Sequence, residues 1–217
     1  MPPPYTAFFY GTLMHPRILT KVIHNGGGHL EICPAVLLDH TRHRVKNAEY
    51  PGVVPYERGR QLFSRDLEQE ERSVRGTLVR GLTLTDIGHL DIFEGDEYER
   101  LPVSVQPLAA FNELSTGSSS ADSLIPQHAT PLPPVQELPE AIDAHTYIFQ
   151  DLRFLEPTLW SWDEFVKKNA WKWYGGVPEA EAASPIIIGE DVGDDAGIPE
   201  VERRRAAMIA GTALAAA

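Results

Sequence analysis

The stretch Tyr10-Gly11-Thr12-Leu13 directly follows a buried-type apolar run and precedes a helix-like pattern. A strand that ends at a glycine leaves backbone N–H donors unpaired, and the missing Cβ lets a ligand approach the chain. A helix that starts nearby adds positive potential. These four residues can therefore form a backbone cradle for an anionic group. A plain strand–helix turn is the alternative.

Glu94 is the carboxylate whose local setting best suits proton transfer. It falls at the end of the predicted helix 85–95, just before Gly95. The negative end of a helix dipole disfavours a charged carboxylate, and the apolar neighbours Ile92 and Phe93 add desolvation, so we expect a raised pKa. A carboxylate with a pKa nearer neutrality transfers protons more effectively. A solvated helix-end glutamate is the commoner alternative.

Other residues that could bind or react are less convincing. His40 and His43 have the spacing of metal ligands, but no third ligand lies at a convincing distance, so a polar hairpin is expected and no metal site. Cys33 is the only cysteine and has no basic neighbour, which favours packing over nucleophilic chemistry. The run Arg203-Arg204-Arg205 is too short to indicate a targeting signal.

The elements that must position these residues are mostly strands. Alternating or buried-type apolar residues predict strands at 5–10, 31–40, 41–47, 72–82, 98–108 and 144–150. Helical spacing predicts helices at 15–24, 85–95 and 157–169, with Thr85 and Thr158 as N-caps. The stretch 50–55 is expected to be turn-rich. Few strand–helix–strand units repeat, so the predicted class is α+β, a small, mostly antiparallel β-barrel with flanking helices.

The formal charge of −12 is concentrated in two irregular segments. Residues 112–143 hold five acids and residues 178–200 hold seven, and neither segment contains Lys or Arg. We therefore predict one domain over 1–177 with a disordered insertion at about 112–143, and a tail, 178–217, outside the core. The acidity also argues against non-specific nucleic-acid binding.

Targeting signals and membrane segments are not expected. No apolar run approaches the roughly 20 residues that a membrane helix needs. The N-terminus has no basic residue before its short apolar stretch, unlike a secretory signal. A lone cysteine excludes an internal disulfide, and a cytoplasmic location is the default expectation.

Several motifs occur together in an order that resembles a known family. They are "FFYGTL" at 8–13, "YPGVVP" at 50–55, "GTLVRGLTLTDIGHLDIFEGDEYER" at 76–100, and "TYIF" at 146–149 followed by "WDEF" at 162–165. Together they resemble the γ-glutamylcyclotransferase-like family, specifically its avirulence-induced-gene branch. The resemblance covers roughly 5–108 and 144–174, and the family fold is a small β-barrel with flanking helices.

The resemblance implies an enzyme that releases 5-oxoproline and an amine from a γ-glutamyl amide, without metal or cofactor. It implies that Tyr10, Gly11, Thr12 and Leu13 hold the glutamyl moiety and that Glu94 is the general acid/base. In the same motif Tyr98 is expected to line the pocket and Arg100 to pair with an acid. Surface or supporting roles are expected for the remaining carboxylates of this stretch, Asp91, Glu97 and Glu99.

Two alternatives stay open at this point. One is a hydrolase on the same barrel that uses Glu94 to activate water. The other is a non-catalytic small-molecule binder or scaffold. The expected partner is a small-molecule γ-glutamyl substrate, not a nucleic acid or a membrane; the sequence does not identify the leaving amine or the oligomeric state.

Overall fold

Five strands close into a barrel in the computed structural model, which describes residues 4–48, 50–114, 131–161 and 205. Neighbouring strands follow the order β5-β1-β8-β6-β2, and β2 pairs back with β5. Only the β1–β8 pairing in this ring is parallel. The strands are β1 (Tyr5–Phe9), β2 (Glu31–Leu38), β5 (Ser73–Leu82), β6 (Tyr98–Pro107) and β8 (Ile142–Phe149). The predicted mostly antiparallel barrel is confirmed.

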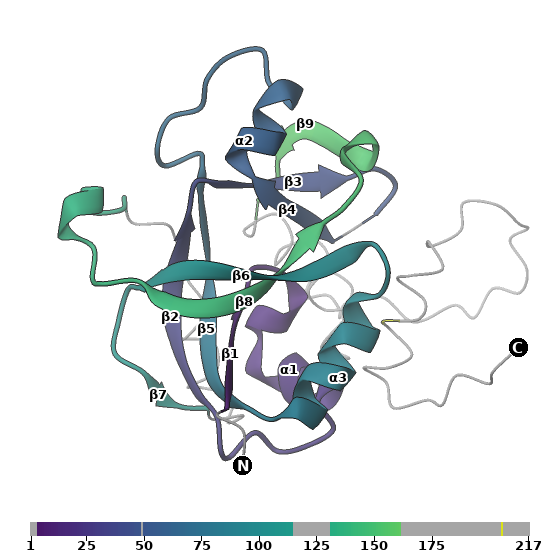
Figure 1. Ribbon diagram of the computed structural model, residues 1–217, viewed down its shortest axis with the longest axis vertical. Coiled ribbons are helices and arrows are strands. Elements are labelled where there is room, and N and C mark those ends of the chain that lie inside the picture. Colours follow the sequence, from purple (N-terminus) through teal and green to yellow (C-terminus); the bar gives the residue numbers. More distant parts are fainter. Residues whose placement is uncertain (1–3, 49, 115–130, 162–204, 206–217) are drawn as a thin grey trace, which may run out of the picture.

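A small second sheet and several helices pack at one end and on one side of the barrel (Figure 1). The sheet has the order β4-β3-β9, formed by β4 (Pro51–Pro55), β3 (His40–Val45) and β9 (Leu155–Leu159). The α-helices are α1 (Pro16–Val22), α2 (Tyr56–Gly59) and α3 (Leu84–Glu94). Short 3-10 helices lie at η1 (Thr12–Met14), η2 (Arg60–Leu62), η4 (Val135–Glu137) and η5 (Leu152–Phe154). In Figure 1, α1 and α3 lie on the same side of the barrel, and α2 lies with the small sheet at one end.

No helix among the described residues is long and apolar enough to cross a bilayer.

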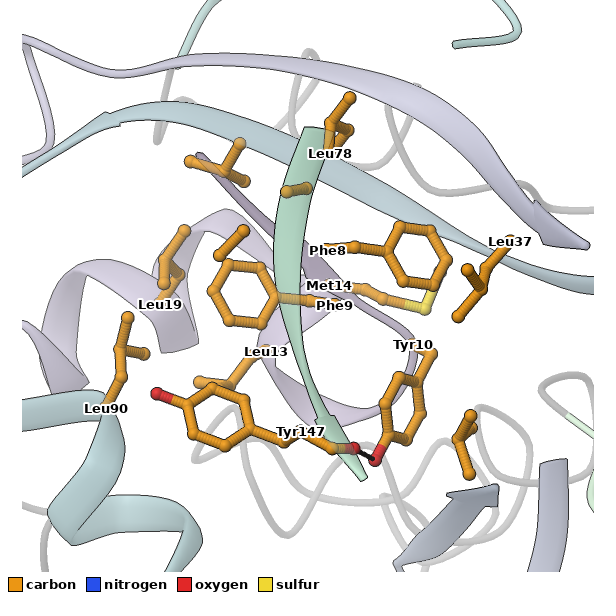
Figure 2. Packing of buried hydrophobic residues seen from close by; sticks show 14 of the residues in the cluster. Phe8, Phe9, Tyr10, Leu13, Met14, Leu19, Leu37, Leu78, Leu90 and Tyr147 are labelled. Carbon is orange, nitrogen blue, oxygen red and sulfur yellow. Dashed lines mark hydrogen bonds between the residues drawn. The ribbon is translucent and has the colours of Figure 1, made fainter. Parts of the chain in front are cut away.

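Strand β1 is buried on both faces, which explains its continuous apolar run. The rings of Phe8 and Phe9 point to opposite sides, as neighbours in a strand do (Figure 2). Both rings are buried in the same cluster of apolar residues. Because apolar burial contributes roughly 25 cal/mol per Å², this strand anchors the loop that follows it, Tyr10–Leu13.

Helix α3 begins with a capping box at Thr83, so the prediction of Thr85 as its N-cap is wrong. The Thr83 hydroxyl accepts a hydrogen bond from the backbone N–H of Asp86 at 3.2 Å. In return, the Asp86 carboxylate accepts one from the backbone N–H of Thr83 at 2.8 Å. Burial by itself opposes ionisation of Asp86. Hydrogen bonds from Thr83, His29 and Asn25 outweigh burial and hold its pKa below the usual value. The cap fixes where α3 starts, and therefore where Glu94 falls at its other end.

Replacing Thr83 by alanine is expected to destabilise the protein by about 1 kcal/mol, because the Asp86 backbone N–H loses its acceptor and the Asp86 carboxylate loses one of its donors. Thr85→Ala is the matched control, since Thr85 is exposed in the first turn of the same helix. Urea unfolding followed by circular dichroism measures both. Equal losses from the two variants would contradict the assigned cap.

Other boundaries differ from the sequence-based expectation. The stretch 50–55 is a strand, β4, and 155–159 is a strand, β9, where a helix was predicted to start at 157. Thr158, predicted as the N-cap of that helix, lies in β9, and residues 160–161 are not helical; the rest of the predicted helix, 162–169, lies outside the described residues. Part of the predicted disordered insertion is ordered, because β7 (Asn112–Glu113) pairs with β2 and β8 already starts at Ile142.

Candidate active site

One cavity gathers every site residue expected from the sequence. It lies where β1 ends, where α3 ends and where β6 begins. The residues that line it are Phe8, Phe9, Tyr10, Gly11, Thr12, Leu13, Tyr50, Pro51, Phe93, Glu94, Tyr98, Tyr147 and Arg205. Residues 10–13, Glu94 and Tyr98 therefore face a common space, although up to 88 positions separate them in the sequence.

The Tyr10–Leu13 loop lines the cavity and contains backbone N–H groups that have no intrahelical acceptor. Thr12 and Leu13 open the short helix η1, so their N–H groups precede any intrahelical acceptor, and no side chain in the described part of the chain caps them. The Arg42 guanidinium fixes the loop from behind by donating to the Tyr10 carbonyl at 2.7 Å. A Cβ on Gly11 would lie 3.2 Å from Pro51 Cγ, so glycine keeps the cavity wall open here.

Glu94 ends α3 and turns its carboxylate into the cavity. The following residue, Gly95, has a φ of 71°, a left-handed conformation that glycine adopts without strain. Gly95 thus stops the helix, as the sequence indicated. The Glu94 side chain is 15% exposed. Among the described residues that line the cavity, it carries the one carboxylate.

The phenols around the cavity are neutral hydrogen-bond donors and are already engaged. Burial raises the pKa of Tyr10, Tyr98 and Tyr147 well above the ordinary value, and the charge of Glu94 raises each further. Tyr10 donates to the Tyr147 carbonyl (Figure 2), and Tyr98 donates to the Pro51 carbonyl at 2.8 Å. These phenols therefore shape the cavity wall, and Glu94 is the carboxylate among the described residues that line it.

A second layer of charged groups holds the wall in place. Asp91 accepts hydrogen bonds from Tyr147 Oη and Arg100 Nε, each at 2.8 Å. This pair confirms the expectation that Arg100 binds an acid. Glu97 likewise accepts the Tyr50 hydroxyl at 2.8 Å. Asp91 and Glu97 thus orient pocket tyrosines, whereas Glu99 is exposed.

Arg205 is the member of the site that sequence reasoning missed. Its Nη2 lies 2.9 Å from Glu94 Oε2, and its side chain is only 4% exposed. Burial alone lowers the pKa of Arg205, but the neighbouring Glu94 and tyrosine side chains more than offset this and raise it. The tail was predicted to lie outside the core, and Arg205 is an exception to that prediction. The sequence-based expectation of a raised pKa for Glu94 did not take this cation into account. A cation beside a carboxylate favours its ionised form.

Two further residues singled out in the sequence have structural settings. His43 is buried, with its ring nitrogens 2.8 Å from Thr41 Oγ1 and 2.9 Å from the Glu156 carbonyl. Cys33 is buried in β2, and burial raises the pKa of its thiol to about 11. A thiol with that pKa is a poor nucleophile at neutral pH.

A family comparison adds to this geometry. The model of the family described as "Gamma-glutamyl cyclotransferase, AIG2-like" matches residues 7–117, which is just over half of the chain. The chain belongs to this family. The match includes the Tyr10–Leu13 loop, Tyr50, Glu94 and Tyr98, whereas Arg205 lies beyond it.

Curated relatives of this family member come from Arabidopsis thaliana. AIG2-like protein A is 30% identical over 101 residues, which cover 46% of this chain and 52% of the relative. Protein AIG2 C is 25% identical over 104 residues, which cover 48% of this chain and 53% of the relative. The chain thus spans about half the length of the curated relatives it matches.

Solved structures with a similar fold are also found. A solution structure from Arabidopsis thaliana gives a TM-score of 0.49 at 19% identity, covering 88% of this chain and 98% of its own. The crystal structure of a yeast gamma glutamyl cyclotransferase specific to glutathione gives a TM-score of 0.41 at 13% identity. The match covers 68% of this chain and 69% of the yeast chain.

Proposed function

We propose that this AIG2-like protein releases 5-oxoproline and an amine from a γ-glutamyl amide. In this reaction the α-amine of the substrate attacks its own γ-carbonyl carbon, and a five-membered lactam forms as the bond to the leaving nitrogen breaks. Holding the two reacting groups in one ring-shaped conformation removes much of the entropic barrier. The enzyme then has to move one proton and stabilise the oxygen of the carbonyl under attack.

Glu94 is assigned the proton transfer. As the attacking nitrogen bonds to carbon it loses a proton to Glu94, and Glu94 returns that proton to the leaving nitrogen, so that charge and atoms balance. The observation that carries the proposal is that this part-buried carboxylate shares a cavity with the backbone donors of residues 10–13. The tyrosine hydroxyls around it are directed to other acceptors, which supports Glu94 as the proton carrier.

The Tyr10–Leu13 loop is assigned the glutamyl moiety. Its uncapped N–H groups are suited to oxygen atoms of the substrate, because donors already fixed by the fold need no reorganisation during the reaction. Tyr98 and Tyr50 supply aromatic walls. No part of this scheme requires a metal or a cofactor.

The test is a panel of γ-glutamyl amides whose leaving groups are an amino acid, a cysteinyl peptide, a lysine side chain and an arylamine. Products are separated by liquid chromatography and mass spectrometry, with 5-oxoproline and free glutamate quantified. Release of 5-oxoproline supports cyclotransfer. Release of glutamate instead would support the hydrolase, and turnover of no amide by any form of the protein would support a binding role.

A further inference from the structure

The guanidinium of Arg205 fills the cavity as a ligand would. Besides the Glu94 carboxylate at 2.9 Å, it donates to the Glu94 carbonyl at 3.0 Å and the Phe93 carbonyl at 3.2 Å. Its central carbon lies 4.3 Å from the ring centre of Tyr50, 5.3 Å from that of Tyr98 and 5.4 Å from that of Phe93. A buried cation is stabilised by such hydrogen bonds to a carboxylate and by contact with aromatic faces.

The space that remains beside Arg205 is too small for a substrate. The cavity volume is about 30 Å³, which suffices for about one water molecule. Sites for small organic ligands measure roughly 300–1,000 Å³. A glutamyl group can therefore reach Glu94 only after the Arg205 side chain has left.

Arg205 also competes for the chemistry of the site. The guanidinium beside Glu94 stabilises the ionised carboxylate, and a carboxylate held in an ion pair with arginine is a weaker proton acceptor. The arginine belongs to a segment 111 positions beyond Glu94 and outside the range that matches the family model.

We propose that Arg205 inhibits the site by occupying it as an intramolecular cation, so that activity depends on withdrawal of the Arg205 side chain. This inference rests on the proposed function only in taking the cavity as the substrate site. A second reading, in which Arg205 positions the substrate, predicts the opposite change in activity and is separated by the same variants.

The first experiment measures binding and needs no turnover. A fluorescein-labelled peptide with the sequence of residues 199–211 is titrated with the full-length Arg205→Ala protein and with the unmodified protein, and anisotropy is recorded. We expect the Arg205→Ala protein, whose cavity is vacated, to bind the peptide at least about 10-fold more tightly, a ratio equivalent to about 1.4 kcal/mol. Two variant peptides serve as controls, one with Arg203 and one with Arg205 replaced by alanine. Only the peptide that lacks Arg205 should bind the Arg205→Ala protein more weakly than the original peptide does.

Equal affinity of both proteins for the peptide, or no binding to a folded Arg205→Ala protein at millimolar peptide, would overturn the proposal. If the alanine variant does not fold, Arg205→Lys replaces it, because lysine keeps the charge but lacks the planar fork and the aromatic stacking. Its peptide affinity should then lie above that of the unmodified protein.

The second experiment measures activity on any γ-glutamyl amide found to react. Arg205→Ala should raise kcat/KM at least about 10-fold if Arg205 blocks the site, whereas Arg203→Ala should leave it unchanged. A fall in kcat for Arg205→Ala would assign Arg205 to substrate positioning and reject the inhibitory role. If neither protein turns over any amide, the proposed function fails while the peptide titration still decides the inhibitory contact.

Discussion

Glu94→Gln is expected to lower kcat by about 10²–10⁴-fold, the usual contribution of a positioned general acid/base. Glutamine keeps the size of the side chain and most of its hydrogen-bonding shape, but it cannot accept a proton at neutral pH. The measurement is 5-oxoproline release under saturating substrate, so that kcat and KM separate. Glu99→Gln is the matched control, because Glu99 is an exposed carboxylate of the same motif.

The ion pair with Arg205 determines how this variant must be tested. In the unmodified chain, Glu94→Gln leaves a buried guanidinium without its carboxylate, and breaking a buried pair from one side destabilises a protein. The substitution should therefore be made in the Arg205→Ala chain as well, which completes a double-mutant cycle. We expect Glu94→Gln to lower the thermal midpoint more in the unmodified chain than in Arg205→Ala.

Activity in the Arg205→Ala background isolates the chemistry. There, Glu94→Gln should lower kcat by the same factor of about 10²–10⁴ while the thermal midpoint stays close to that of Arg205→Ala alone. Full activity of the double variant would reject Glu94 as the proton carrier. An equal loss from Glu99→Gln would point to a general electrostatic effect of the acidic motif.

Most of the barrel could be predicted because its strands carry their own local signal. The ranges 72–82 and 98–108 alternate in hydrophobicity, and they become β5 and β6 with shifts of a residue at one end. The buried run before Gly11 becomes β1 for the same reason. In each of these strands the local sequence pattern, alternating in β5 and β6 and continuously apolar in β1, agrees with the burial of the strand in the fold.

The errors occur where pairing with a distant strand outweighed local preference. Residues 155–159 contain Pro157 and precede a helical pattern, yet they form the edge strand β9 against β3. An edge strand tolerates proline because one row of its backbone groups has no ladder partner. Pro51 and Pro55 likewise bound the edge strand β4, which the sequence suggested was a turn.

The candidate site was predicted unevenly for a related reason. Glu94 and the Tyr10–Leu13 loop lie in motifs whose order along the chain resembled a family. Arg205 lies in an acidic and then Ala-rich stretch without apolar periodicity, where nothing local indicates a partner 111 positions away. An ion pair between residues so far apart in the sequence is a property of the tertiary structure and leaves no spacing signal.

Gly76→Ala is expected to be the most damaging single-methyl substitution in the barrel. A Cβ at this position would lie 2.1 Å from the Phe9 carbonyl oxygen and 2.6 Å from Phe8 Cζ. The nearest of these atoms belongs to the backbone of β1, which cannot rotate away, so β1 and β5 must separate. Overpacking of this kind costs typically about 1–3 kcal/mol, and we expect about 3 kcal/mol here.

The effect should extend to the site because β1 leads directly into Tyr10 and Gly11. Gly88→Ala is the matched control: its Cβ meets nothing within 4 Å, and alanine in place of glycine within helix α3 should stabilise by roughly 0.5–1 kcal/mol. Urea unfolding compares the two variants with the unmodified chain, and peptide binding in the Arg205→Ala background reports on the cavity. If Gly76→Ala unfolds at the same urea concentration as the unmodified protein, the close contact between β1 and β5 does not exist in solution, and the placement of the Tyr10–Leu13 loop loses its support.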